Sequence, residues 1–240
     1  MRRFFPREIR DGIAYIDGAE AAHLSRVLRM GPGDRVVLAD QGMEHEAELT
    51  AVGKEEAQAR ILETRACPGE PRAHITLCAA YMKADKMELI AQKATELGVS
   101  RFQPFFSSRC VKQPAGKSEE KALERMERIS WEAVKQCGRA KPMEIGRPLP
   151  MEELLETVRQ AELAIFAYEA AEQPLREALA KARGKTNVCL VVGSEGGFSP
   201  EEAAQIAEAG AMSVSLGPRI LRGETAAIAL TAAVAWEMGC

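Results

Sequence analysis

The chain has 240 residues, 46% of them hydrophobic and 28% charged, with a formal net charge of −3, which predicts a globular protein of one large or two modest domains. Its six cysteines form no Cys-x-x-Cys pair and its three histidines have no metal-ligand spacing, which argues against a structural zinc site. The charged N-terminus is unlike a signal peptide and no apolar run is long enough to span a membrane, so we predict a cytoplasmic protein with reduced thiols and no metal.

Charge is unevenly distributed along the chain. Residues 101–147 hold eleven Lys or Arg against six Asp or Glu, whereas residues 151–210 hold five against eleven. A basic band of this kind could bind a polyanion. For residues 118–137 taken alone, a solvated helix with internal ion pairs is the favoured alternative.

Residues 1–70 are predicted to be rich in β-structure. Short segments rich in strand-forming residues are separated by Gly, Asp and Pro, at 12–16, 35–39, 46–52 and 57–63. We expect these strands to close into a small barrel. One short helix, at 19–27, interrupts them and carries Arg26, with Arg29 following it. Small barrels with a basic rim often bind nucleic acid, which is an analogy of fold.

From residue 75 onward, predicted strands alternate with predicted helices. Two prolines and a glycine at 67–72 indicate a linker before this region. We expect strands at 75–81, 101–106, 163–168, 188–192 and 212–216, and helices at 85–98, at 118–137 and from 225 onward. The helix at 85–98 is expected to start with a capping box formed by Asp85 and Glu88 and to end at Gly98. The alternation predicts an α/β domain with a parallel sheet covered by helices on both faces.

A glycine loop follows the apolar strand at 188–192. Ser199 at the N-cap, Pro200 at the first helical position and Glu202 three residues after the cap predict a helix that starts there. Glycines 193, 196 and 197 lie at the carboxyl end of the strand, where open α/β sheets bind ligands. The loop lacks the lysine of a phosphate-binding Walker loop, which suits a ligand without phosphates. A tight turn that needs glycine is the alternative interpretation.

The segment 216–225 lies between the last predicted strand and the last predicted helix. Arg219 and Arg222 precede a helix N-terminus, where the helix dipole disfavours cations. Such a local conflict often occurs at functional sites, which favours a functional role for Arg222. An arginine paired with a neighbouring carboxylate explains Arg219 equally well.

These two segments resemble the paired cofactor loops of the SPOUT methyltransferases. They read Gly193-Ser-Glu-Gly-Gly-Phe-Ser199 and Leu216-Gly-Pro-Arg-Ile-Leu-Arg-Gly-Glu-Thr-Ala226. The chain is more closely similar to the RsmE family of bacterial 16S rRNA (uracil-N3) methyltransferases, which three further stretches also fit, at 23–29, 86–98 and 132–139. The resemblance therefore covers nearly the whole chain.

The resemblance implies two domains, a cofactor and two partners. Residues 1–70 would form a PUA-like β-barrel that helps to hold RNA, and residues 71–240 a SPOUT methyltransferase domain with a trefoil knot. The second domain would bind S-adenosylmethionine and form a homodimer, and the substrate would be 16S rRNA of the small ribosomal subunit. The cofactor-binding residues would be Val192, Gly193, Glu195, Gly196, Gly197, Leu216, Gly217, Ile220, Leu221, Arg222 and Thr225.

The reaction so implied requires loss of the uracil N3 proton. Negative charge then spreads onto the adjacent carbonyl oxygens, where a guanidinium would stabilise it. Our first candidate is Arg222 and the next is Arg139, while Glu195 and Glu224 are the carboxylates best placed to influence the proton. The proposed RNA contacts are Arg26, Arg29, Arg109 and Arg139, each of which could instead be a surface arginine with a carboxylate partner.

The sequence is also compatible with two other functions. One is a non-catalytic RNA-binding or ribosome-assembly factor that keeps the fold without using the cofactor. The other is a methyltransferase of the same fold that acts on a different RNA position or on a ribose 2′-hydroxyl.

Overall fold

The computed structural model describes residues 3–111 and 114–239, and the chain divides into two compact units. The first comprises residues 1–70 and 134–141, and the second comprises residues 71–133 and 142–240. The segment 134–141 therefore packs with the N-terminal strands, an arrangement that the sequence pattern did not indicate.

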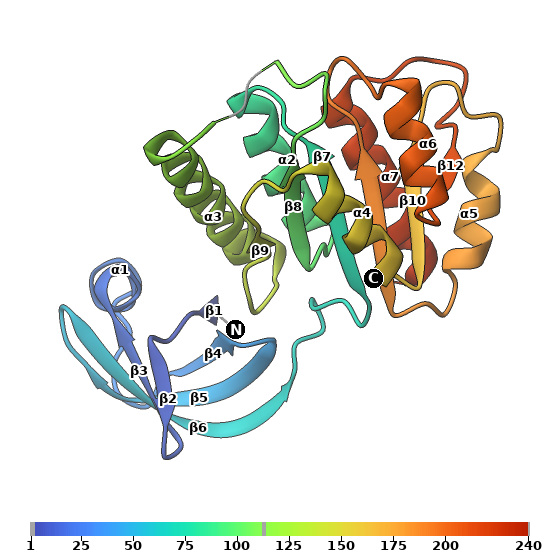
Figure 1. The fold of residues 1–240 in the computed structure, drawn as a ribbon. Helices are drawn as coiled ribbons and strands as arrows, with labels where there is room; N and C mark the ends of the chain where they lie inside the picture. Colours follow the sequence, from blue (N-terminus) through green and yellow to red (C-terminus); the bar gives the residue numbers. More distant parts are fainter. Residues whose placement is uncertain (1–2, 112–113, 240) are drawn as a thin grey trace. The chain divides into compact units, whose positions relative to one another are not determined.

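The N-terminal unit is built on one six-stranded sheet (Figure 1). Its order is β1-β4-β5-β6-β3-β2, and all its pairs are antiparallel except that of β1 with β4. In the described residues β1 and β2 do not pair with each other, and the sheet is curled into a half-barrel, which agrees with the PUA-like architecture that we expected. The strands are β1 (Arg3–Phe4), β2 (Glu8–Arg10), β3 (Ile13–Asp17), β4 (Arg35–Asp40), β5 (Met43–Val52) and β6 (Glu56–Ala66).

The helix expected at 19–27 is two shorter pieces. An α-helical turn, α1 (Gly18–Ala22), leads directly into a π-helical turn, η1 (His23–Val27), which buries Leu24 in the unit's core. Arg29 follows with φ +53°, a left-handed conformation that L-residues seldom adopt. Arg26 and Arg29 are both exposed, as an RNA contact requires.

Arg139 belongs to the interior of the N-terminal unit. Its side chain is 2% exposed, and its Nη2 lies 3.1 Å from Oε2 of Glu70. Oε1 of Glu70 also accepts a hydrogen bond from the backbone N–H of Ala140 at 2.7 Å. A buried guanidinium that is paired with a carboxylate is not available to a substrate, so this placement corrects the catalytic and RNA-contacting roles expected of Arg139 and indicates a structural one.

The second unit is built on a six-stranded sheet in which every pair is parallel, as the sequence predicted. Its order is β12-β10-β11-β7-β8-β9, which places β11 between β10 and β7. The strands are β7 (His74–Ala80), β8 (Arg101–Phe105), β9 (Glu144–Ile145), β10 (Leu163–Ala167), β11 (Asn187–Val192) and β12 (Met212–Val214).

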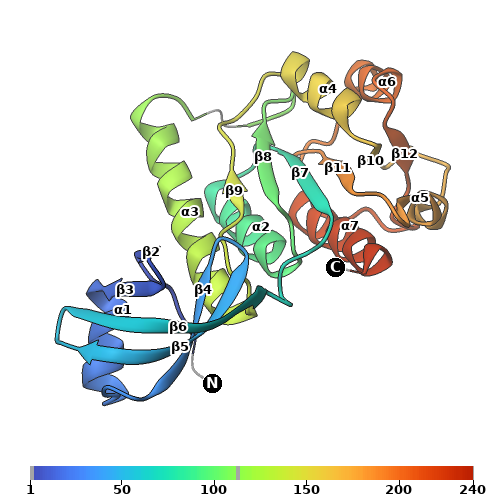
Figure 2. The same ribbon diagram turned by 90° about the horizontal axis from the view of Figure 1, so that it is seen from below.

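Helices cover both faces of this sheet (Figure 2). Side chains of α2, α5 and α7 join the core on one face, and those of α4 and α6 the core on the other. The bounds are α2 (Ala84–Glu96), α3 (Lys117–Cys137), α4 (Met151–Gln160), α5 (Leu175–Ala182), α6 (Pro200–Glu208) and α7 (Gly223–Met238). Helices α4 and α5 were not predicted. No helix in the described ranges is long and apolar enough to cross a membrane.

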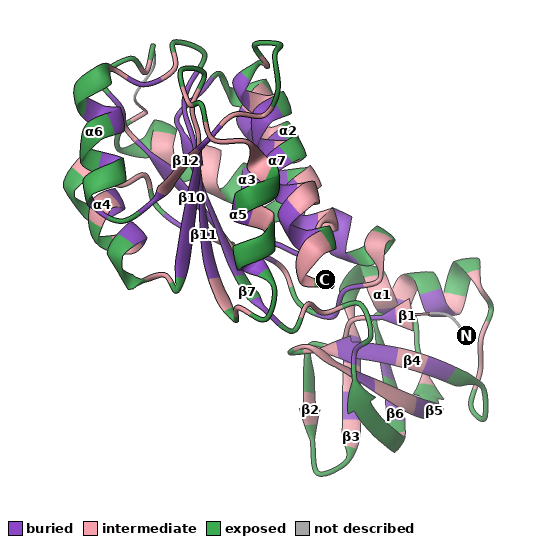
Figure 3. Ribbon diagram, turned by 90° about the vertical axis from the view of Figure 1, so that its right-hand side faces the viewer, coloured by how far each residue is buried: buried purple, intermediate pink, exposed green. Residues whose placement is uncertain are grey.

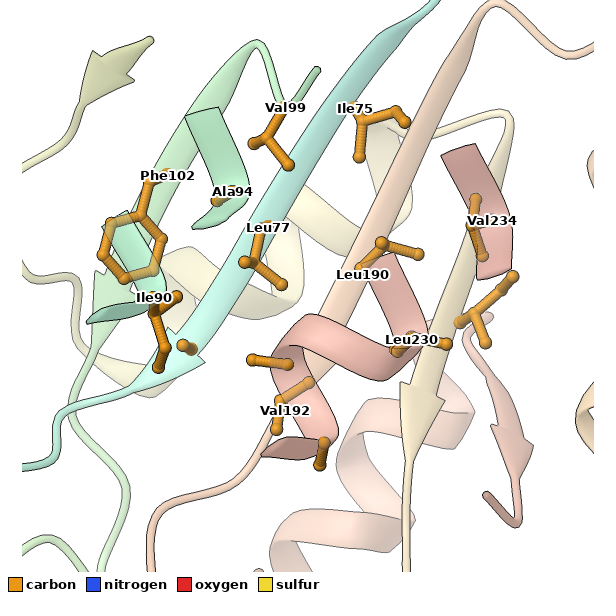
Figure 4. Close-up of a cluster of buried hydrophobic side chains, with 14 of the residues drawn as sticks. Ile75, Leu77, Ile90, Ala94, Val99, Phe102, Leu190, Val192, Leu230 and Val234 are labelled. Atoms are coloured by element: carbon orange, nitrogen blue, oxygen red, sulfur yellow. The ribbon is translucent and has the colours of Figure 1, made fainter. Parts of the chain in front are cut away.

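Strand β11 is buried from Val188 to Val192 (Figure 3). Leu190 and Val192 point toward α2 and α7, together with Leu77 of β7 (Figure 4). Cys189 and Val191 alternate with them and pack on the opposite face. The carboxyl end of β11 is therefore held rigidly in the middle of the domain.

Two predicted helix starts had different outcomes. The capping box of α6 is present, because Ser199 Oγ accepts from the Glu202 N–H at 3.2 Å and Glu202 Oε2 accepts from the Ser199 N–H at 2.9 Å. The capping box expected from Asp85 and Glu88 is wrong: α2 has its N-cap at Lys83, without a side-chain cap. The helix starts two residues too early for Asp85 to be its N-cap.

Candidate active site

A cavity of about 660 Å³ lies at the carboxyl edge of the parallel sheet, within the second unit. Its wall comes from the residues after β10, the glycine loop after β11, the segment after β12, and the first turns of α2 and α7. The lining residues are Lys86, Ala167, Tyr168, Glu169, Val192, Gly193, Ser194, Glu195, Gly196, Gly197, Phe198, Ser215, Leu216, Gly217, Pro218, Arg219, Ile220, Leu221, Arg222, Gly223 and Ala226. The volume is in the range of small-molecule and cofactor sites.

The glycine loop is a tight turn whose backbone forms one wall of the cavity. The N–H of Gly197 donates to the carbonyl of Ser194 at 3.0 Å, and Gly197 has φ +67°. A Cβ at this position would lie 2.7 Å from Oε1 of Glu169, so only glycine fits without displacing that side chain.

A second loop, at 107–110, is clamped onto the glycine loop. Glu202 is 8% exposed, and its Oε1 accepts from the N–H of Ser108 at 2.6 Å while its other oxygen caps α6. Arg109 Nη1 donates to the carbonyl of Gly196 at 2.9 Å, and Ser194 Oγ donates to the carbonyl of Arg109 at 3.3 Å. Each oxygen of the buried Glu202 carboxylate accepts a hydrogen bond from a backbone N–H, and the carboxylate thereby ties the loop 107–110 to the end of the glycine loop segment.

Helix α7 starts in close contact with the glycine loop. A Cβ on Gly223 would lie 2.7 Å from Met82 Sδ and 3.1 Å from the carbonyl oxygen of Gly193. The first turn of α7 can therefore approach the ends of β7 and β11 only because residue 223 has no side chain.

Lys86 connects three of the segments around the cavity. Its ammonium nitrogen lies 3.1 Å from Oε1 of Glu195 in the glycine loop and 3.3 Å from Oε2 of Glu224 in the first turn of α7. The side chains of Lys86 and Glu224 are each 14% exposed. Glu224 Oε2 is buried without an aligned hydrogen bond, so this contact is an ion pair and not a directed bond.

The pKa shifts follow from this arrangement. Burial lowers the pKa of Lys86, but the two carboxylates outweigh burial and the net shift is upward. Burial raises the pKa of Glu195, but its own backbone N–H and the ammonium of Lys86 outweigh burial and the net shift is downward. Both groups are therefore held in their charged forms at neutral pH.

The structure brings most of the expected cofactor residues together. Ten of the eleven line the cavity, namely Val192, Gly193, Glu195, Gly196, Gly197, Leu216, Gly217, Ile220, Leu221 and Arg222. Thr225 is exposed on α7 and does not line it. Arg219 is exposed at the cavity, and Arg109 is exposed beside the glycine loop. Arg26, Arg29 and Arg139 belong to the other unit.

Five lining residues lie outside the expected cofactor residues and the two loop segments that the sequence analysis singled out, namely Lys86, Ala167, Tyr168, Glu169 and Ser215. Lys86 is the first residue of the stretch 86–98, which contributed to the family resemblance. That stretch was the only sequence feature that could have indicated a role for Lys86. Tyr168 and Glu169 follow β10, and the sequence pattern did not indicate that β10 lies next to β11.

We expect the Lys86→Met substitution to raise the pKa of Glu195, because burial then acts without the ammonium that offsets it. Because its pKa is lowered, ionised Glu195 stabilises the fold at pH values above the usual carboxyl pKa. This contribution is lost as the pH falls through the lowered pKa. In urea unfolding, the stability difference between wild type and Glu195→Gln should be constant from about pH 6 to pH 9 and should shrink below about pH 4. The difference should be small or reversed in the Lys86→Met background.

Lys93→Met is the matched control for Lys86→Met, since Lys93 lies on the same helix and pairs with Glu96 at 2.9 Å. It should leave the pH dependence due to Glu195 unchanged. The same pH dependence in the Lys86→Met protein would show that the ion pair does not set the pKa of Glu195.

Comparisons with known proteins agree with this geometry. Residues 69–235 match the model of the RNA methyltransferase domain, and residues 16–62 match that of the RNA methyltransferase PUA domain. The chain is 30% identical to ribosomal RNA small subunit methyltransferase E of Bacillus subtilis, over 99% of this chain and 97% of that protein. It is 32% identical to the protein of the same name from Mycobacterium bovis, over 92% and 86% of the two chains.

A solved structure provides a further match. The Neisseria gonorrhoeae ribosomal RNA small subunit methyltransferase E, crystallised with S-adenosyl methionine, superposes with a TM-score of 0.80 at 31% identity, over 97% of this chain and 96% of that one. Together, the family models, the identity over the full length and the shared fold show that the chain belongs to the ribosomal RNA small subunit methyltransferase E family of RNA methyltransferases.

Proposed function

We propose that the protein transfers a methyl group from S-adenosylmethionine to N3 of a uridine in 16S rRNA of the small ribosomal subunit, in the cytoplasm. The observation that carries this proposal is the cavity of the second unit, in which the glycine loop and the segment 215–226 face each other. The family to which the chain belongs supports the same reaction.

The residues present fit S-adenosylmethionine. The glycine loop, residues 193–197, contains no lysine and offers backbone groups at close range, which suits a nucleoside without phosphates. Apolar side chains for a flat base come from Val192, Leu216 and Leu221, which line the same cavity. When bound, this cofactor supplies a methyl group activated on a sulfonium.

The chain's own contribution is to orient the uracil and to stabilise the charge left when the N3 proton departs. Arg222 lines the cavity, is exposed, and makes no ion pair in the parts of the chain that the structure describes. Its guanidinium is therefore available to the carbonyl oxygens of the uracil anion. Glu195 is a weak base because its pKa is lowered, which favours a role in holding Lys86 over that of proton acceptor.

We propose that Arg26 and Arg29 of the N-terminal unit and Arg109 of the second unit contact RNA. All three are exposed, and Arg109 also touches the glycine loop through Gly196. In duplex RNA the uracil N3 is engaged in base pairing, so the target must be unpaired or turned out of its stack. The homodimer and the trefoil knot implied by the resemblance stay predictions.

The decisive test is mass spectrometry of rRNA nucleosides from a strain that lacks the protein. We expect loss of 3-methyluridine alone, and its return when the purified protein and S-adenosylmethionine are added to the small ribosomal subunits. Loss of another methylated nucleoside would assign a different target position or a ribose hydroxyl. Unchanged methylation, with no binding of S-adenosylmethionine in calorimetry, would favour a non-catalytic RNA-binding factor.

Replacing Arg222 with alanine should lower turnover more than cofactor affinity. We expect a loss of about 100-fold in kcat, as for removal of one donor to a developing anion, with a change in cofactor Kd below about fivefold. Arg159→Ala is the control and should change neither quantity, since Arg159 is an exposed arginine that pairs with Glu156 and does not line the cavity. Equal losses in kcat and in affinity for Arg222→Ala would assign its guanidinium to cofactor binding.

The Arg26→Ala/Arg29→Ala double variant should weaken RNA binding and flatten its salt dependence. Two lost phosphate contacts reduce the slope of log K against log[salt] by about 1.4 to 1.8. The measurement is fluorescence anisotropy with a 16S rRNA fragment across a salt series, with Arg35→Ala as control because Arg35 pairs with Glu46 in the same unit. An unchanged slope would remove both arginines from the contact surface.

A further inference from the structure

Glu169 stands apart from the other carboxylates of the cavity. It lies two residues after the end of β10, it is exposed, and it lines the cavity. Glu195 and Glu224 are both paired with Lys86. Over residues 3–111 and 114–239, by contrast, the carboxylate of Glu169 makes no hydrogen bond and no ion pair, so its two oxygens are free to accept hydrogen bonds from a ligand.

The carboxylate is placed by the glycine loop. Its Oε1 lies only 2.7 Å from where a Cβ on Gly197 would be, and Gly197 has φ +67°. Any side chain at 197 would push the carboxylate away from the loop. The missing side chain thus lets Glu169 lie against the wall of the cavity.

The strand order separates Glu169 from the lysine cluster. In the sheet, β11 lies between β10 and β7. Glu169 follows β10 and Lys86 follows β7, so the two residues come from the strands on either side of β11, the strand that leads into the glycine loop. Glu195 and Glu224 are therefore held by Lys86, whereas Glu169 is an acceptor without a partner in the described residues.

An ionised carboxylate only accepts hydrogen bonds, so its ligand must present donors. S-adenosylmethionine has three sets of donors, which are the vicinal ribose hydroxyls, the ammonium of its amino-acid part and the 6-amino group of its adenine; only the hydroxyls are missing from a dideoxy analogue. Two adjacent hydroxyls match the two oxygens of one carboxylate, and acidic residues near the glycine loop of α/β nucleotide-binding sites hold ribose in this way. An ion pair between a lone ammonium and an exposed carboxylate would contribute little binding free energy, because solvent screens the two charges.

We propose that Glu169 recognises the ribose of S-adenosylmethionine by accepting hydrogen bonds from both of its hydroxyl groups. This inference rests on the proposed function, namely that the cavity binds this cofactor. Glu169 then selects a nucleoside with an intact ribose diol, while the glycine loop supplies close backbone contact beside it.

The test is calorimetric binding of three ligands to the wild type, to Glu169→Ala and to Glu172→Ala. The ligands are S-adenosylhomocysteine, 5′-methylthioadenosine, which lacks the amino-acid part, and the 2′,3′-dideoxy form of 5′-methylthioadenosine. Glu169→Ala should weaken the first two by the same factor, about ten- to thirtyfold, and should leave the dideoxy compound unaffected. Glu172 is the matched control, since it is exposed three residues further on and does not line this cavity.

Three results would overturn the proposal. If Glu169→Ala weakened all three ligands by the same factor, the carboxylate would hold the adenine amino group. If Glu169→Ala weakened S-adenosylhomocysteine but not 5′-methylthioadenosine, the carboxylate would hold the ammonium. If it bound all three ligands as the wild type does, Glu169 would have no role in binding. Failure of the wild type itself to bind S-adenosylhomocysteine or S-adenosylmethionine would instead count against the proposed function, so the two failures are distinguishable.

Discussion

The ion pairs of Lys86 are the interaction on which the shape of the cavity depends. Lys86 is on α2, Glu195 is in the loop after β11, and Glu224 is at the start of α7, so one ammonium joins segments that are far apart in sequence. The three side chains are between 14% and 26% exposed. Charges that are shielded to this degree interact more strongly than exposed surface pairs, and leaving one of them unpaired is costly.

The apolar core and the backbone supply the rigidity that these charges need. Strand β11 is buried on both faces, and the close approach of Gly223 to Met82 and Gly193 leaves no room for α7 to shift inward. Glu202 ties the neighbouring loop to the start of α6. A site that is preorganised in this way loses little conformational entropy when a ligand binds. More of the free energy of the contacts then contributes to affinity and to the orientation of the ligand.

The same arrangement divides the charged groups of the cavity by role. Lys86 pairs with both Glu195 and Glu224 and makes Glu195 a weak base, which leaves both carboxylates as supports for the loops. Arg219, Arg222 and Glu169 have no such partners in the described residues, and these two cations and one anion of the cavity wall remain for ligands. Charged groups that are paired within the protein therefore shape the site, and unpaired charged groups are left to contact a ligand.

Local sequence determined much of this protein. Short-range hydrophobic patterns and turn residues were sufficient for the parallel sheet and for the capping box at Ser199 and Glu202, because each depends on neighbours within a few positions. Ten residues of the cavity wall were expected from the resemblance of two short segments to a known family. Tertiary structure alone decided the rest. The burial of Arg139 against Glu70, the bridge made by Lys86 and the place of Glu169 beside Gly197 all join segments distant in sequence, and only the strand order and the packing of the chain bring those segments together.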